Sequence, residues 1–315
     1  MIFVFNGDAD GICALQQLCL AEELAQPPVL VTGVKRDTLL LKNISDVKST
    51  SVTVLDIEIE KNHLALEKLL SQGCHVRWFD HHKSKSDTLL IHENLQCWID
   101  TSSSVNTSWI VNQFLNEQHQ LWAAVGLFGD NIHQTAIDIC VKAKLAKNDI
   151  TLLTELGQAL NYNSYGLKIE DLYINPSELW KRIAKFANPL DFIKQDTLCR
   201  ELFLRRQQDL EKALQLHIPF NNTLVLPHQP WAQRVIGEVG HYLAQQEPSI
   251  AHCVAVDNGQ DGFMVSVRAP LVSASGAVEL CSRYETGGGR AGAAGINHLP
   301  KNLFAEFIKH FEKAF

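Results

Sequence analysis

The chain opens with the stretch Met1-Ile2-Phe3-Val4-Phe5-Asn6-Gly7-Asp8-Ala9-Asp10-Gly11, which passes from apolar to polar and then into a helical pattern. Residues 2–5 are continuously apolar, as in a short strand that is buried on both faces. This run has no basic start and is too short for a signal peptide. Apolar residues then recur every three or four positions over residues 11–24, which is typical of a helix. The opening therefore predicts a buried strand, a polar turn and a helix.

The same alternation continues through the first half of the chain. Short apolar runs at residues 29–32, 52–55 and 75–79 predict further strands, and residues 61–72 have helical spacing. Strands that alternate with helices favour a parallel sheet with helices on both faces. In such sheets the reactive residues gather beyond the carboxyl ends of the strands. We therefore expect a functional site at that edge.

The second half predicts mostly helices, followed by a smaller α/β region. Helical patterns cover residues 107–115, the stretch from 121 onward, 148–185, and one long charged helix at 189–216 that Pro219 ends. Strands are expected at residues 222–226, 250–256 and 263–267, and helices at 232–244 and 303–315. The expected fold is α/β, with a parallel-sheet N-terminal domain (1–188), a connector helix (189–216) and a smaller α/β C-terminal domain (217–315).

Acidic side chains follow three of the predicted strands, together with a histidine pair. These residues are Asp8 and Asp10 after the first strand, Asp56 after the third, Asp80, His81 and His82 after the fourth, and Asp130 after the apolar residues 123–128. Close carboxylates repel each other, and a divalent cation removes that conflict. Each element alone is compatible with a helix cap or an ordinary histidine. Their combination favours a site for manganese or iron over a structural zinc site. Two ions about 3.5–4 Å apart would clamp a phosphate.

The order and spacing of four motifs resemble the DHH phosphoesterase family. The motifs are Asn6-Gly7-Asp8-Ala9-Asp10-Gly11, Leu55-Asp56, Asp80-His81-His82 and Gly129-Asp130. The resemblance implies a parallel α/β domain joined to a smaller C-terminal domain, and metal-dependent phosphoesterase activity. It implies one or two Mn²⁺ ions, with Mg²⁺ or Co²⁺ as substitutes, held by Asp8, Asp10, Asp56, His81 and Asp130.

The resemblance also assigns further roles at this site. Asp56 would bridge two metals, Asp80 would orient its neighbours, and His82 would face the scissile phosphate. Many two-metal members carry a histidine four residues before the first aspartate, where this chain has Val4. The RecJ-like branch also tolerates loss of that histidine. The resemblance therefore leaves open whether one or two metals are bound.

A serine-rich segment at residues 100–104 precedes a predicted helix. Hydroxyls and free amides at a helix start form a site for anions, although such a segment is also an ordinary helix cap. The family has a similar serine-rich turn near its active site. The resemblance therefore implies that Ser103 and Ser104 contact a substrate phosphate.

The segment 287–295, Gly-Gly-Gly-Arg-Ala-Gly-Ala-Ala-Gly, has the most unusual composition of the chain. A dinucleotide fingerprint does not fit, because too little chain follows for a βαβ unit. A loop whose bare backbone approaches a phosphate, and a purely structural loop, both remain. The segment resembles the GGGHxxAAG motif of the DHHA1 domain, with Arg290 in place of histidine. This implies that Arg268, Arg290, Gly288 and Gly289 bind the far end of the substrate.

Composition narrows the class of substrate. Hydrophobic residues make up 46% of the chain, and 35 acidic against 28 basic residues give a formal charge of −7. No basic stripe for a long nucleic acid is visible, and no run reaches the roughly 18 apolar residues of a membrane span. The eight cysteines form no CxxC pair, so we expect reduced thiols in a cytoplasmic protein.

We therefore expect a metal-dependent phosphoesterase that hydrolyses small nucleotides or short oligonucleotides with a metal-activated water. The alternatives are a single-strand-specific DNA exonuclease, a polyphosphatase or pyrophosphatase, and a catalytically decayed nucleotide-binding module. A nicotinamide enzyme built on the glycine-rich segment would leave the acidic cluster unexplained. No long duplex and no membrane is expected as a partner, and a homodimer is left open.

Overall fold

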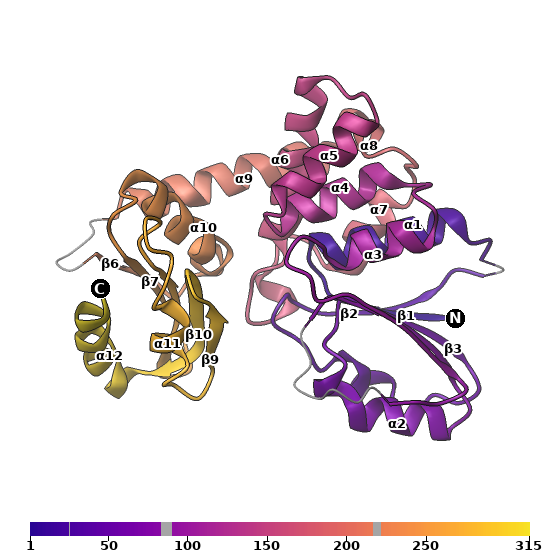
Figure 1. Ribbon diagram of the computed structural model, residues 1–315, viewed down its shortest axis with the longest axis horizontal. Helices are drawn as coiled ribbons and strands as arrows, with labels where there is room; N and C mark the ends of the chain where they lie inside the picture. The colour runs from indigo at the N-terminus through magenta and orange to yellow at the C-terminus, as the bar shows by residue number, and fades with distance from the viewer. Residues whose placement is uncertain (25, 83–89, 217–221) are drawn as a thin grey trace. The chain divides into compact units, whose positions relative to one another are not determined.

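The computed structural model describes residues 1–24, 26–82, 90–216 and 222–315 (Figure 1). These residues form two compact units, Met1–Phe203 and Leu204–Phe315. The division falls within helix α9 (Thr197–Leu214). The domain limits at 188 and 217 remain predictions, and residue 217 lies outside the described residues, as does Pro219.

A parallel sheet organises the first unit. Its described strands are β1 (Ile2–Phe5), β2 (Val29–Thr32), β3 (Ser51–Leu55), β4 (His75–Asp80) and β5 (Leu95–Ile99), in the order β2-β1-β3-β4-β5. All four neighbouring pairs are parallel. Four of these strands were predicted, and the expected α/β class is confirmed. The edge strand β5 was not predicted, because its sequence Leu-Gln-Cys-Trp-Ile mixes polar and apolar residues.

Helices cover both faces of this sheet (Figure 1). Phe3 and Phe5 pack into a core with α1 (Ala9–Ala21), α3 (Thr107–Phe114) and α4 (Gln120–Gly129). Val4 points to the opposite face, into a core with α2 (His63–Ser71). This alternation is the period of two that a strand imposes on its side chains. The fully apolar first strand follows from burial on both faces.

The remaining helical elements of the first unit complete these layers and the connections between them. They are the 3₁₀ turns η1 (Leu40–Ile44), η2 (Glu60–Asn62) and η3 (Ile169–Asp171), and the α-helices α5 (His133–Lys142), α6 (Lys147–Asn163), α7 (Pro176–Ile183) and α8 (Pro189–Gln195). The predicted single helix at 189–216 is wrong, because α8 ends at Gln195 and α9 begins at Thr197. Asp196 breaks the run with extended backbone.

A smaller mixed sheet organises the second unit. Its described strands are β6 (Thr223–Leu226), β7 (His252–Asp257), β8 (Gly262–Arg268), β9 (Gly287–Arg290) and β10 (Ala293–Pro300), in the order β6-β7-β8-β10-β9. Helix α10 (Pro230–Gln246) packs on β7 and β8. Helices α11 (Ala277–Cys281) and α12 (Lys301–Ala314) pack on the core that contains Cys253, Ala255, Val265 and Val267. The smaller α/β region is therefore confirmed.

The glycine-rich segment corrects the prediction of a loop. Residues 287–290 form edge strand β9, which pairs antiparallel with the start of β10. A side chain at Gly287 would lie 1.7 Å from the carbonyl oxygen of Cys281. Glycine is therefore required here for close approach of the backbone to α11.

Two further observations bear on the class of protein. All eight cysteines are free thiols, most of them buried. Among the residues that the structure describes, no helix combines the length and apolar character needed to cross a bilayer.

Candidate metal centre

The predicted metal ligands lie at the ends of their elements, along the carboxyl edge of the first sheet. Asp8 caps the N-terminus of α1 just beyond β1, and Asp56 follows β3 directly. Asp80 is the last residue of β4, so the histidine pair follows it. Asp130 caps the C-terminus of α4. The rule that reactive residues gather at this edge therefore describes the structure correctly.

Five of these residues form two overlapping groups that are suited to a metal ion. The groups are Asp10, His81 and Asp130, and Asp56, His81 and His82; in each group the ligand atoms lie within 4.8 Å of one another. His81 Nε2 lies 3.4 Å from Asp56 Oδ1 and 3.9 Å from Asp10 Oδ2. His81 is therefore the shared member. Carboxylate oxygens with imidazole nitrogens are donors that suit Mn²⁺ and related ions.

The N-terminus of α3 holds the Asp10 carboxylate in place. The backbone N–H groups of Thr107 and Ser108 donate to Asp10 Oδ2 and Oδ1 at 2.8 and 2.6 Å. Asn106, the N-cap of this helix, donates from Nδ2 to Asp130 Oδ2 at 3.1 Å. Helix N-terminal amides otherwise lack partners, and the helix dipole favours a negative charge there. Sequence reasoning missed these residues, although three polar residues at a helix start were the available signal.

Asp56 adopts backbone geometry that is uncommon for a residue other than glycine. Its φ is +59°, in the left-handed region, and its N–H donates to the Phe79 carbonyl at 3.0 Å. Aspartate tolerates this region better than most residues, at a cost of about 1 kcal/mol. Such geometry persists where the surrounding structure holds it, and it often marks functional sites. At Asp56 it turns the chain sharply at the end of β3.

The electrostatics of the cluster show a strain that a cation would relieve. Burial, followed by the charges of Asp56 and Asp130, raises the pKa of Asp10 well above its ordinary value. Burial, followed by the charge of Asp8, raises the pKa of Asp56 to about 6. Burial alone would lower the pKa of His81, but the neighbouring carboxylates raise it to about 10. Excess negative charge is therefore buried here, and the donor set fits a divalent cation.

Asp80 orients His82. His82 Nδ1 lies 2.7 Å from Asp80 Oδ1, and the same oxygen accepts the backbone N–H of His81. Burial alone would lower the pKa of His82, but its hydrogen bond to Asp80 and the charge of Asp56 raise it. The side chain of His82 is 40% exposed, whereas Asp80 is buried. The arrangement leaves Nε2 of His82 as the ring nitrogen available to a ligand.

Lys35 is a member of the cluster that sequence reasoning missed. Its ammonium lies 2.5 Å from Asp8 Oδ2, 3.3 Å from Asp130 Oδ1 and 3.0 Å from Asn161 Oδ1. Burial alone would lower the pKa of Lys35, but Asp8 and Asp130 raise it well above its ordinary value. In turn, burial would raise the pKa of Asp8, but Lys35 lowers it. Lys35 comes three residues after β2, so the strand-end rule was a signal for it as well.

The serine-rich segment lies at the surface. Ser103 and Ser104 are exposed, and the Ser104 carbonyl accepts a hydrogen bond from Thr135. Helix α3 starts only at Thr107, and the N–H groups of its first two residues bind Asp10. A phosphate contact of Ser103 and Ser104 remains a prediction.

The predicted C-terminal substrate residues lie together in the second unit. Arg268 on β8 and Arg290 on β9 are both in register with Ala293 on β10. Their α-carbons are therefore two strand spacings apart, about 10 Å, in one row of the sheet. Arg268 also donates to the Ser266 hydroxyl and the Gly237 carbonyl, which ties β8 to α10. Arg290, Gly288 and Gly289 are exposed.

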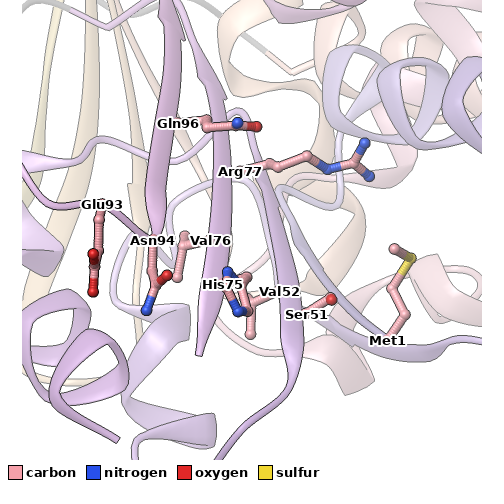
Figure 2. A pocket seen from close by; sticks show the side chains of 9 residues that line it. All are labelled: Met1, Ser51, Val52, His75, Val76, Arg77, Glu93, Asn94 and Gln96. Carbon is pink, nitrogen blue, oxygen red and sulfur yellow. The ribbon is translucent and has the colours of Figure 1, made fainter. Parts of the chain in front are cut away.

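A cavity opens at the opposite, amino edge of the first sheet (Figure 2). Ser51 and His75, the first residues of β3 and β4, lie in its wall. Its volume is about 190 Å³. The lining residues are Met1, Ser51, Val52, His75, Val76, Arg77, Glu93, Asn94 and Gln96. None of the candidate metal ligands is among them.

Solved structures share the fold of this chain. A DHH-domain protein described as a member of a family of ribosomal proteins matches 99% of this chain and 85% of its own (13% identity, TM-score 0.69). The exonuclease RecJ bound to manganese matches 99% and 89% (16% identity, TM-score 0.63). PggH, a pGpG-specific phosphodiesterase from Vibrio cholerae, matches 100% and 99% (13% identity, TM-score 0.53). No family model and no curated protein matches the chain.

These likenesses establish the fold. The structural neighbours are DHH-domain proteins, and this chain has their arrangement of a parallel-sheet unit followed by a smaller mixed-sheet unit. The resemblance indicated by the four motifs is therefore confirmed for the fold. The assignment of individual site residues stays a prediction.

Proposed function

We propose that the chain is a manganese-dependent phosphoesterase that hydrolyses phosphodiester bonds in small nucleotides or short oligonucleotides. One observation carries the proposal. Three segments far apart in sequence bring Asp10, His81 and Asp130 within reach of one ion, and Asp56 and His82 flank them. The carboxylates of this set lie close together, and a divalent cation would offset their mutual repulsion.

The residues of this chain would hold and orient the reacting groups. Asp10, Asp56, His81 and Asp130 would hold the ion. When bound, a divalent ion lowers the pKa of a water molecule and offsets negative charge on phosphate oxygens. His82, fixed by Asp80, would donate a hydrogen bond from Nε2 to a phosphate oxygen or to the leaving group.

Charge and the second unit support a small substrate. The chain carries a formal charge of −7, which gives little grip on a long nucleic acid. The exposed Arg290 lies in the same sheet row as Arg268 and two residues along β9 from Gly288. A side chain at Gly288 would meet no described atom within 4 Å apart from its chain neighbours. Arginine suits phosphate through its forked donors. We assign this row to the far end of the substrate, with Ser103 and Ser104 as further phosphate contacts. The free thiols fit a cytoplasmic protein.

The test is a screen of substrates with purified protein and Mn²⁺. Linear and cyclic dinucleotides, short RNA, pAp, polyphosphate and long single-stranded DNA are incubated with wild type and with Asp56→Asn. We expect turnover of a dinucleotide or short oligonucleotide by wild type alone. Salt-sensitive degradation of long single strands would support an exonuclease, and turnover of polyphosphate alone a polyphosphatase. Nucleotide binding without any turnover would contradict the proposal and support a decayed module.

A further inference from the structure

We infer that the Lys35 ammonium stands permanently where a second divalent ion would bind beside Asp8, so that the centre holds one divalent ion and one built-in cation. The inference rests on the proposed metal centre. It concerns how many ions that centre takes and which residue replaces the other.

The contacts of Lys35 match the requirements of an ammonium group. An ammonium has three N–H donors, and three oxygen acceptors surround this one, on Asp8, Asp130 and Asn161. Two of the three acceptors are carboxylates, and the ring of Tyr165 lies 5.8 Å away. The side chain is 25% exposed. Lys35 is therefore built into the cluster as its cation.

The backbone around Lys35 is held close to Asp8. The Lys35 N–H donates to the Ser164 carbonyl at 2.9 Å, and its carbonyl accepts from Asn6 Nδ2 at 3.2 Å. A side chain at Gly7 would lie 2.1 Å from the Gly33 carbonyl oxygen, so the turn after β1 and the turn after β2 pack directly on each other. These contacts place the stem of Lys35 next to Asp8.

Asp8 is engaged in a way that leaves it outside both metal-binding groups. Its Oδ1 accepts the backbone N–H groups of Asp10 and Gly11, and its Oδ2 accepts Lys35. It is 2% exposed. Neither group of potential ligands includes it. Asp8 was predicted as a metal ligand, and its geometry instead suits a helix cap that is paired with a lysine.

Val4 stands where many two-metal members of the resembled family carry a histidine, so this position supplies no ligand. Its side chain is fully buried and belongs to the apolar core that contains Val54 and Leu40. It offers no donor atom. A second ion beside Asp8 would therefore meet the positive charge of Lys35, with Asp8 and the neighbouring Asp56 as its carboxylate ligands, whereas Asp10, His81 and Asp130 offer a single ion three ligand atoms within 4.8 Å of one another.

The experiment measures bound manganese by equilibrium dialysis with metal analysis, together with the Mn²⁺ EPR spectrum. Wild type, Lys35→Met and the matched surface variant Lys42→Met are compared at saturating Mn²⁺, after thermal melts confirm folding. We expect one uncoupled ion per chain for wild type and for Lys42→Met. For Lys35→Met we expect a second, weaker ion and spin coupling between the two.

Each outcome separates this inference from the proposed function. Two spin-coupled ions in wild type would overturn the role of Lys35 while leaving a phosphoesterase intact. A single ion in Lys35→Met at millimolar Mn²⁺ would also overturn it. Where Lys35→Met fails to fold, an anomalous diffraction map of Mn²⁺-loaded wild-type crystals decides, because a peak beside Asp8 contradicts the inference. Absence of any bound ion in wild type would instead refute the metal centre itself.

Discussion

The two edges of the first sheet are built from the same strands, yet they differ in how their charges are satisfied. At the amino edge, Arg77 forms a two-pronged pair with Glu22, at 2.6 and 3.0 Å, and also donates to Thr53. At the carboxyl edge, Lys35 pairs with Asp8 and Asp130, while the buried Asp10 and Asp56 lie beside His81. At the amino edge the charge of Arg77 is thus compensated by Glu22, whereas the buried carboxylates of the carboxyl edge would accept a cation.

This difference between the two edges shows why a cavity alone does not identify a catalytic site. The cavity at the amino edge is lined mainly by half-buried or exposed side chains (Figure 2). The carboxyl edge places Asp10 and Asp56 almost out of contact with solvent. Such charges are tolerated where a partner or ion compensates them. The buried carboxylates therefore distinguish the carboxyl edge as the candidate functional edge, and four predictions test that contrast.

Asp56→Asn is expected to have the largest effect. Asparagine tolerates the left-handed backbone of this position but carries no charge to hold the ion. Activity on the substrate found in the screen should fall at least about a thousandfold, as on loss of a main electrostatic element. Initial rates at saturating Mn²⁺ measure this, with Glu93→Gln at the amino edge as the control. Comparable losses in both variants would abolish the contrast between the edges.

Removal of metal is expected to lower the free energy of unfolding only in proteins whose ligands at the carboxyl edge are intact. A ligand that binds only the folded state at 100 times its Kd stabilises it by about 2.7 kcal/mol. Thermal melts in Mn²⁺ and in EDTA should differ by several degrees for wild type and for Glu93→Gln, and by much less for Asp56→Asn. An equal shift in all three proteins would place the ion elsewhere.

In the metal-free protein, the pH dependence of the free energy of unfolding should show what the buried charge of Asp56 costs. Burial raises the pKa of Asp56 from 3.8 to about 6, so the folded state disfavours the ionised form. The penalty is absent below pH 3.8, grows up to about pH 6 and is complete above it. In EDTA, Asp56→Asn should therefore be more stable than wild type by about 3 kcal/mol at pH 7.5. Urea unfolding at pH 7.5 and 4.5 should show this difference shrinking at the lower pH; a constant difference would contradict it.

Arg77→Met is expected to have the smallest effect. It removes a partly buried pair of the amino edge, and we expect a loss of about 1 kcal/mol in unfolding free energy with unchanged activity and Mn²⁺ affinity. Urea unfolding and the rate assay measure the two quantities. A fall in activity that exceeds the loss of stability would show that the amino edge takes part in function.

Much of the fold followed from patterns that are local in sequence. The short, mainly apolar runs that became β1 and β3, and the three-to-four spacing of apolar residues in α1, predicted these elements because burial sets such periods. β5, β9 and β10 were not predicted: β5 mixes polar and apolar residues, and residues 287–295, which form β9 and the start of β10, are mostly glycine and alanine. An edge strand has one neighbour and need not be fully apolar. The pairing of β9 with β10 depends on that neighbour more than on its own four residues.

The sequence by itself determined which side chains would follow the strands, and with them the edge at which the aspartates and histidines meet, because the chain direction of a parallel sheet carries every strand end to one side. Only the tertiary structure decided how those side chains are partnered. Lys35 and Asp8 are 27 residues apart, and Lys35 and Asp130 are 95 apart. No periodic pattern links such positions. Their contact arises from the packing of turns and helices, which places an ammonium among carboxylates that the motifs alone would assign to metal.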